Sequence, residues 1–161
     1  MLAGDLYLAD DPELIRDSKR ARQLTHRINA LDPTDLEERN RLLRELLGAF
    51  GDGSEIRPPL QCDYGYQTTI GARTFANWGL ILLDVARITI GDDVQIGPNV
   101  QLLTATHPLE PGPRRDKWEA AEPITIGVSS PGNWYFDNSS RTSISTSSNS
   151  SLSSTMSALF M

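Results

Sequence analysis

Apolar residues recur along the chain in two patterns, one typical of helices and one typical of short strands. Residues 10–29 and 31–51 are predicted to be helical, and an aspartate followed by proline opens each. Asp11 would cap the first helix with Pro12 in its first turn, and Asp32 with Pro33 would open the second. The second helix would end at Gly48 or Gly51. Its expected apolar face consists of Leu36, Leu43, Leu47 and Phe50.

From about residue 56 the pattern changes to short apolar segments separated by glycine. One set of apolar residues recurs every six positions, with a two-residue slip before Ile90: Ile70, Ala76, Leu82, Ile88, then Ile90, Ile96 and Leu102. A companion set keeps the same period four residues later: Val94, Val100 and Thr106. A period of six is typical of a parallel β-helix, in which the recurrent aliphatic residues stack inside. We therefore predict a mainly β fold.

These patterns divide the chain into three parts. Residues 1–55 form the N-terminal helical segment, and residues 56–127 form the β-helix. Within the β-helix, the polar and proline-rich residues 107–123 break the repeat and are expected to form an extruded loop. The serine-rich residues 128–161 show no register, and we expect them to be largely disordered. The abrupt change at residue 128 leads to the hypothesis of a frameshift, an unspliced intron or a cloning junction.

Composition excludes several classes of partner. The net charge of -6 creates no field that would attract phosphates, so nucleic acid is not an expected partner. No run approaches the roughly 20 apolar residues of a membrane span, and no leader pattern is visible at the N-terminus, so we expect a cytoplasmic protein. Cys62 is the one cysteine and has no neighbouring cation to activate it, which predicts a structural role.

Several motifs together carry a resemblance to a known family. They are "CDYGYQTTIG", "FANWGLILLDV", "ITIGDDVQIGPNVQLLTATHPLEP" and "PITIG", preceded by "AGDLYLADDPEL" and "RARQLTHRIN". Over residues 3–127 the chain resembles the maltose and galactoside O-acetyltransferases of the hexapeptide-repeat superfamily. The resemblance implies a left-handed parallel β-helix that assembles as a homotrimer, with active sites between subunits. It also implies acetyl-CoA as co-substrate, a sugar hydroxyl as acceptor, and no metal.

Within this resemblance, His107 matches the general base of the family. An imidazole that is neutral near pH 7 can take the proton of a sugar hydroxyl while its oxygen attacks the thioester, without a covalent enzyme intermediate. A surface histidine in a loop is the alternative. His26, the other histidine, lies inside a predicted helix among polar neighbours and is expected to be structural.

Two residues match positions near the acceptor pocket of the family, Asn77 in "FAN" and Asp84 in "LDV". An amide and a carboxylate suit a neutral polyol, which is recognised by oriented hydrogen bonds. Asn and Asp also serve turns and corners, and this alternative stays open. Trp78 and Trp118 suit stacking on a sugar or on adenine, although packing is the commoner role of tryptophan.

Three further acidic positions fall near the acceptor or the base in the resemblance. Asp63 and either Asp10 or Asp11 match acceptor contacts, and we assign Asp11. Glu119 in the loop would orient the imidazole or touch the substrate, with a solvated loop glutamate as the alternative. The residues that bind the coenzyme stay unknown, because the basic residues that contact its phosphates in the family have no counterpart here.

The expected function is therefore acetyl transfer from acetyl-CoA to a maltose-like or glucose-like sugar, with activity impaired by the altered C-terminus. A non-catalytic β-helix fragment that associates with full-length relatives is the alternative. A zinc-dependent lyase of the same superfamily is disfavoured, because such a site needs about three histidines and the chain has two.

Overall fold

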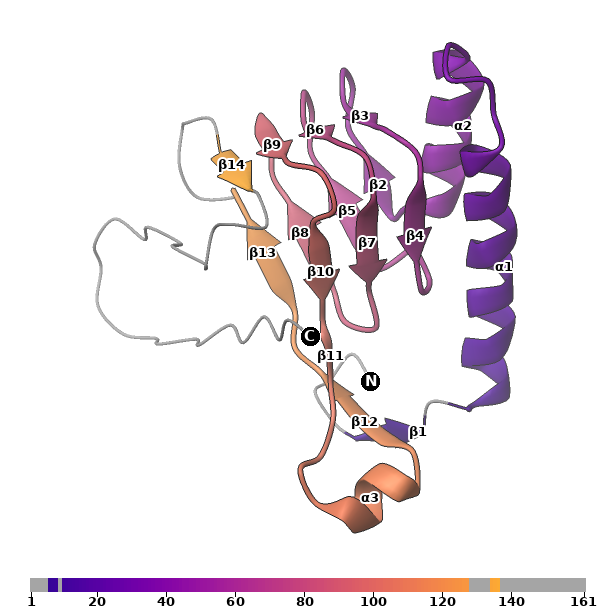
Figure 1. Cartoon of the computed structure of the whole chain (residues 1–161), viewed down its shortest axis with the longest axis vertical. Helices are drawn as coiled ribbons and strands as arrows, with labels where there is room; N and C mark the ends of the chain where they lie inside the picture. The colour runs from indigo at the N-terminus through magenta and orange to yellow at the C-terminus, as the bar shows by residue number, and fades with distance from the viewer. Residues whose placement is uncertain (1–5, 9, 128–133, 137–161) are drawn as a thin grey trace, which may run out of the picture.

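The computed structural model describes residues 6–8, 10–127 and 134–136, and it shows a parallel β-helix with two helices packed against one end (Figure 1). Three parallel sheets form the sides of the β-helix. The first contains β2 (Ala49–Phe50), β5 (Thr68–Ile70), β8 (Ile88–Ile90) and β13 (Ile124–Ile126). The second contains β3 (Glu55–Ile56), β6 (Phe75–Ala76), β9 (Val94–Ile96) and β14 (Trp134–Phe136). The third contains β4 (Leu60–Cys62), β7 (Leu80–Leu83) and β10 (Gln101–Leu103).

Coils of the β-helix before the hairpin stack at a constant offset. Leu60 pairs with Leu80, and Thr68 pairs with Ile88, so each of these coils is 20 residues long. The coil that contains the hairpin is longer, since Ile88 pairs with Ile124. Three sides of six residues would give 18, and the two extra residues lie at the corner between the third sheet and the first. This corner explains the slip before Ile90 in the sequence. Ile88 and Ile90 are both buried in β8, so the slip is part of every coil rather than a break between two registers.

The core of the β-helix is the column of aliphatic side chains that the sequence predicted. Strands β5, β8 and β9 alternate buried and half-buried residues, as expected for strands with one face inside. Leu80, Leu82, Ile88 and Val94 are fully buried in this column.

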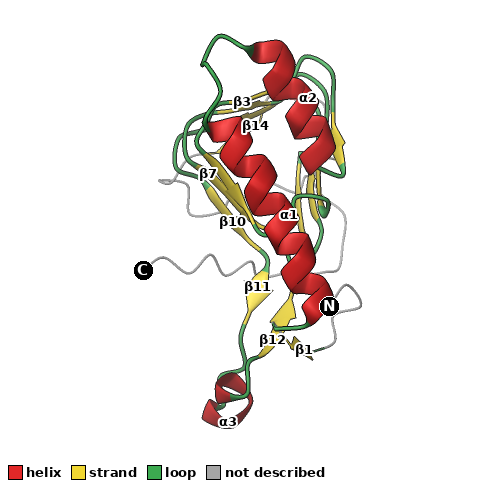
Figure 2. Cartoon of the chain, turned by 90° about the vertical axis from the view of Figure 1, so that its right-hand side faces the viewer, coloured by secondary structure: helices red, strands yellow, loops and turns green. Residues whose placement is uncertain are grey.

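Helix α1 (Pro12–Asn29) closes one end of this column (Figure 2). As predicted, Asp11 caps it, since its side chain accepts a hydrogen bond from the backbone N–H of Glu13 at 2.8 Å. Leu24 and Ile28 are buried in the same core as the strands. At its C-terminal end, the Asn29 side chain donates to the carbonyl of Leu60 and accepts from its N–H, both at 2.8 Å. This pair of bonds fixes the helix to β4.

Helix α2 (Leu36–Leu46) differs from the prediction at both ends. Its cap is Asp35, whereas Asp32 holds the preceding turn by accepting from Thr34. The helix ends before Gly48, where an added Cβ would lie 2.5 Å from the backbone oxygen of Tyr66, so close packing rather than a helix cap requires this glycine.

The apolar face predicted for α2 is also wrong in part. Leu36 is half exposed at the first turn, and Phe50 belongs to β2. The residues of α2 that are buried are Arg39, Leu42, Leu43 and Leu46. The spacing alone could not choose this face, because leucines stand on adjacent positions at 42–43 and 46–47.

The segment that interrupts the repeat contains regular structure that the sequence analysis did not predict. Strand β11 (Ala105–Thr106) pairs in antiparallel orientation with β12 (Trp118–Ala121), and the short helix α3 (Pro111–Arg115) lies between them. The N-terminal strand β1 (Tyr7–Leu8) pairs with the other edge of β12. Residues 7–8 and 118–119, which are far apart in the sequence, therefore meet beside the β-helix (Figure 1).

After Gly127 the sequence analysis expected no further coil. The backbone of β14 nevertheless adds a parallel strand beside β9. The expectations for the remaining residues from 128 onward lie outside the described residues. In the part of the chain that the structure describes, no helix is long and apolar enough to cross a membrane.

Because the aliphatic column forms the core, substitution of a leucine inside it should lower the free energy of unfolding far more than substitution of a leucine outside it. Leu82→Ala should lower the free energy of unfolding by about 2–5 kcal/mol, because Leu82 is fully buried between neighbouring coils. Leu36→Ala should change it by less than about 0.5 kcal/mol, because half of Leu36 is exposed. Urea denaturation followed by circular dichroism measures both, and equal losses would contradict this assignment of the core.

Candidate active site

His107 follows β11 at the point where the hairpin leaves the β-helix. Its side chain is 43% exposed, and Nδ1 lies 3.8 Å from Oε1 of Glu119. Glu119 is on β12, and the pairing of Thr106 with Ala120 brings the two strands together. A carboxylate that closes to hydrogen-bond distance of Nδ1 favours the neutral tautomer with its proton there, which leaves Nε2 as the basic nitrogen. The arrangement suits a general base.

Tyr7 is a third member of this group and was not among the predicted residues. Its hydroxyl donates a 2.8 Å hydrogen bond to Oε2 of Glu119. Burial and the Glu119 carboxylate raise the pKa of Tyr7 well above its usual range, so the hydroxyl stays protonated. The sequence carried no usable signal, because β1 has only two residues and lies 112 positions from its partner carboxylate.

Asp84 occupies the corner after β7 and is fully buried. It accepts hydrogen bonds from the backbone N–H of Tyr64 at 2.9 Å and from the hydroxyl of Thr68 at 3.2 Å. Burial raises the pKa of Asp84, although these hydrogen bonds oppose the effect. The corner role that the sequence analysis left open is thus clearly present, since Asp84 joins two successive coils.

Asp63 lies at the equivalent corner one coil earlier. Burial, followed by the carboxylates of Asp84 and Glu119, raises the pKa of Asp63 to about 6, and Arg22 opposes this effect. Asp63 therefore interacts electrostatically with Asp84, from the next coil, and with Glu119, from β12. Carboxylates can accept several hydrogen bonds from hydroxyl groups.

The same corner in the third coil carries Thr104 instead of a carboxylate. Its hydroxyl donates to the carbonyl of Leu83 at 2.6 Å and accepts from the N–H of Ala86 at 2.9 Å. This buried residue fixes the chain three positions before His107. The base is thus anchored to the β-helix although it lies on an exposed loop.

Two predicted site residues lie apart from this group within the chain. Asn77 is at a different corner, after β6, where its side chain accepts from the N–H of Trp78 at 2.9 Å. Asp11 is occupied as the cap of α1. Its neighbour Asp10 forms an ion pair with Lys117 at 2.8 Å, which ties the N-terminal segment to the hairpin.

The two tryptophans, His26 and Cys62 have surroundings that give no indication of a catalytic role. Trp78 is half exposed and packs its ring against the guanidinium of Arg57 at 5.0 Å. Trp118 is half-buried on β12. His26 is exposed on α1. Burial and two carboxylates raise the pKa of Cys62 well above its usual range, which agrees with an unreactive thiol.

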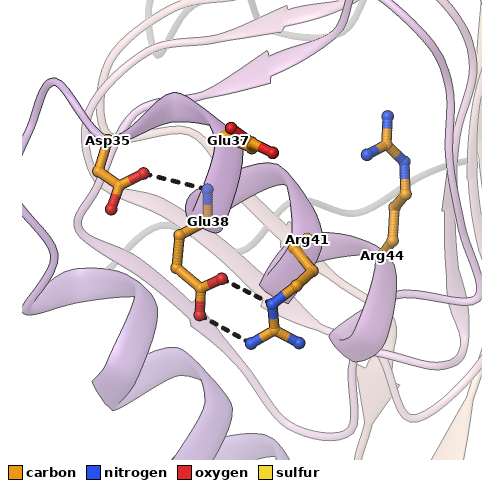
Figure 3. A pocket seen from close by; sticks show the side chains of 5 residues that line it. All are labelled: Asp35, Glu37, Glu38, Arg41 and Arg44. Carbon is orange, nitrogen blue, oxygen red and sulfur yellow. Dashed lines mark hydrogen bonds and ion pairs between the residues drawn. The ribbon is translucent and has the colours of Figure 1, made fainter.

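A surface hollow beside α2 is a second place where a ligand site could be sought (Figure 3). It is lined by Asp35, Glu37, Glu38, Arg41 and Arg44. Glu38 and Arg41 form a two-point ion pair at 2.6 and 2.7 Å, and Asp35 caps the helix. Three of the lining residues thus stabilise α2, and Arg44 forms an ion pair with Asp52 outside the hollow, so we do not choose the hollow as the candidate site. Within the described residues, no cluster of three His, Cys, Asp or Glu side chains could hold a metal ion.

Comparison with known proteins places this geometry in a family. A family model described as the maltose acetyltransferase hexapeptide capping motif matches residues 1–51. Nodulation protein L of Rhizobium meliloti (strain 1021) is 43% identical over 127 residues, which are 79% of this chain and 69% of that protein.

Solved structures give the same result. A maltose O-acetyltransferase from Clostridium difficile 630 has a TM-score of 0.75 and 37% identity, over 76% of this chain and 65% of that one. A galactoside acetyltransferase in complex with coenzyme A has a TM-score of 0.74 and 32% identity, over 77% and 62% of the two chains. The likeness confirms the predicted left-handed parallel β-helix. The chain spans about two thirds of the length of these relatives.

The raised pKa of Asp63 predicts a pH dependence of stability. Because its pKa of about 6 lies above the ordinary 3.8, the folded chain binds this proton more readily than the unfolded chain. The ionised form of Asp63 therefore destabilises the fold. This destabilisation is complete above about pH 6 and absent below about pH 4. The stability gained by Asp63→Asn should be about 1–2 kcal/mol larger at pH 7.5 than at pH 4.5, after allowing for solvent screening.

Urea denaturation at the two pH values measures this difference. Asp52→Asn is the control, because the Asp52 side chain is 99% exposed, and its effect should be the same at both pH values. A gain from Asp63→Asn that does not vary with pH would show that this carboxylate is not in an acidic, partly buried environment.

Proposed function

Because the chain belongs to the maltose and galactoside O-acetyltransferase family of hexapeptide-repeat proteins, we propose that it transfers the acetyl group of acetyl-CoA to a sugar hydroxyl. The family relation supports acetyl transfer as the reaction class. The acceptor, a maltose-like or glucose-like sugar, and the residues that act on it are parts of the proposal. Residues 128–161 depart from the hexapeptide pattern, and we propose that they lower the activity.

The observation that carries the proposal is the pairing of His107 with Glu119 at 3.8 Å. Nε2 of His107 takes the proton of the acceptor hydroxyl while the hydroxyl oxygen attacks the thioester carbonyl. The carbon–sulfur bond then breaks, and the imidazolium returns the proton to the thiolate. The products are the acetyl ester and coenzyme A, and His107 ends in its starting state. The Glu119 carboxylate stabilises the imidazolium that forms in between.

The carboxylates that interact with Glu119, the partner of His107, support a polyol acceptor. Asp63 interacts electrostatically with the buried Asp84 and with Glu119, and carboxylate oxygens accept hydrogen bonds from sugar hydroxyls in fixed directions. Asp63 would contact the acceptor, whereas Asp84 would shape the pocket, because its oxygens already bind Tyr64 and Thr68. Asp11 lies apart from this group within the chain and caps α1 through one carboxylate oxygen, so we propose only its second oxygen as an acceptor contact.

We further propose that the chain works as a cytoplasmic homotrimer. Asn77 lies at a corner of the β-helix that does not carry His107, so it can join the site only from another copy of the chain. In this arrangement, the amide of one subunit would face the imidazole of its neighbour across the interface.

The activities of two alanine variants, one at each histidine, test the proposal. Release of the coenzyme A thiol from acetyl-CoA is measured with glucose, maltose or a galactoside. His107→Ala should lower acceptor-dependent release by at least about 100-fold, since a positioned base contributes a factor of that order. His26→Ala should retain activity within about twofold, because that side chain is exposed on α1.

Three results would contradict the proposal. Equal losses in both variants would show that His107 has no special role. Acceptor-independent release would contradict transfer to a sugar, and absent release by the unmodified chain would favour the alternative, a non-catalytic chain that associates with full-length relatives. Co-purification with such a relative would then be the expected behaviour.

A further inference from the structure

Tyr7 and His107 contact opposite oxygens of the same carboxylate, that of Glu119. The Tyr7 hydroxyl donates to Oε2 at 2.8 Å, and Nδ1 of His107 lies 3.8 Å from Oε1. From this geometry we propose that Tyr7 is a positioning residue, whose hydroxyl holds the Glu119 carboxylate against the imidazole. The inference rests on the proposed function of His107 as a base, and it assigns a role in it to the N-terminal segment.

The ring of Tyr7 is fixed in place before any substrate binds. It is 8% exposed and belongs to a small apolar cluster whose other buried members are Tyr64, Val85, Ala86 and Ala121. These residues lie at the corner of the β-helix and on β12. A packed aromatic ring has few rotamers, so its hydroxyl is a fixed donor rather than a mobile one.

The backbone around Tyr7 holds the same geometry. Strand β1 pairs with β12 so that Tyr7 is opposite Glu119 and Leu8 is opposite Trp118. The ion pair of Asp10 with Lys117 lies next to this pairing and joins the same two segments. The N-terminal segment is therefore attached along β12, and the tyrosine hydroxyl is the part of it that reaches the carboxylate.

Glu119 needs such a restraint because of its neighbours. Its charge repels that of Asp63, an interaction strong enough to contribute to the raised pKa of Asp63. A glutamate side chain has three rotatable bonds, and repulsion favours rotamers that turn toward solvent. The 3.8 Å separation from Nδ1 is too long for a hydrogen bond, so a small displacement decides whether the pair tightens or separates.

Tyr7→Phe tests the role of the hydroxyl, because it keeps the packed ring. We expect kcat to fall about tenfold, as for the loss of a hydrogen bond to a charged group, with both KM values within about twofold. Lys117→Met is the matched control, since it releases the ion pair to Asp10 but leaves the Tyr7 hydroxyl in place. Its kcat should stay within about twofold.

A double variant asks whether Tyr7 acts through Glu119. In the Glu119→Gln background the further effect of Tyr7→Phe on kcat should shrink to less than about twofold, because the charge to be positioned is gone. A full tenfold loss in both backgrounds would overturn the inference. So would an unchanged kcat in Tyr7→Phe, or an equal loss in Lys117→Met.

A second measurement does not depend on activity. The imidazole signals of His107 in NMR spectra can be assigned by comparison with His26→Ala, since the chain has two histidines. At fixed pH, Tyr7→Phe should shift them in the same direction as Glu119→Gln, and Lys117→Met should leave them unchanged. Should the unmodified chain transfer no acetyl group, the proposed function fails, and these spectra still decide the role of Tyr7. Unchanged His107 signals in Tyr7→Phe would overturn it.

Discussion

Parallel pairing at an offset of 20 residues is the constraint on which the rest of the structure depends. It places Ile70 over Ile90 and Leu82 over Leu102, so a single aliphatic column forms the core. It also places equivalent corners of successive coils above one another. Because the corner between the third sheet and the first contains two residues more than a six-residue side allows, it has room for side chains that are not aliphatic.

That corner is where polar residues enter the fold. Asp84 is buried there, and an ionised carboxylate without partners would be strongly unfavourable. The N–H of Tyr64 and the hydroxyl of Thr68 satisfy it, and both come from the preceding coil. Asp63 and Thr104 stand at the same corner of the neighbouring coils. His107 and Glu119 come from the hairpin that leaves the β-helix after this corner, so coil length accounts for the corner residues and the hairpin for the pair.

The β-helix could be predicted from the sequence because an aliphatic residue recurs at the inward-facing position of each strand. The period of six identified the strands and the resemblance gave the handedness. The start of α2 could not be predicted, since Asp32 and Asp35 are both good caps and only the structure shows that Asp32 holds a turn. The buried face of α2 depends on contacts with the strands, which adjacent leucines do not reveal.

The site was accessible to sequence reasoning only in part. His107, Asp63, Asp84 and Glu119 stand in or beside recognisable motifs, and the structure brings them together at one corner. Asn77 lies elsewhere, because it is at the corner between β6 and β7, whereas Asp84 is at the corner after β7. Tyr7 was missed because its contact with Glu119 requires two short strands to pair across almost the whole described chain. No local pattern encodes such a pairing.

The central claim is that acetyl transfer takes place at the corner of the β-helix beside His107. A crystal structure of the complete chain with coenzyme A and a sugar acceptor tests it most directly. The account predicts an acceptor hydroxyl oxygen within about 3 Å of Nε2 of His107, with Asp63 in contact with the sugar. A sugar bound away from this corner, with Nε2 facing solvent, would contradict it.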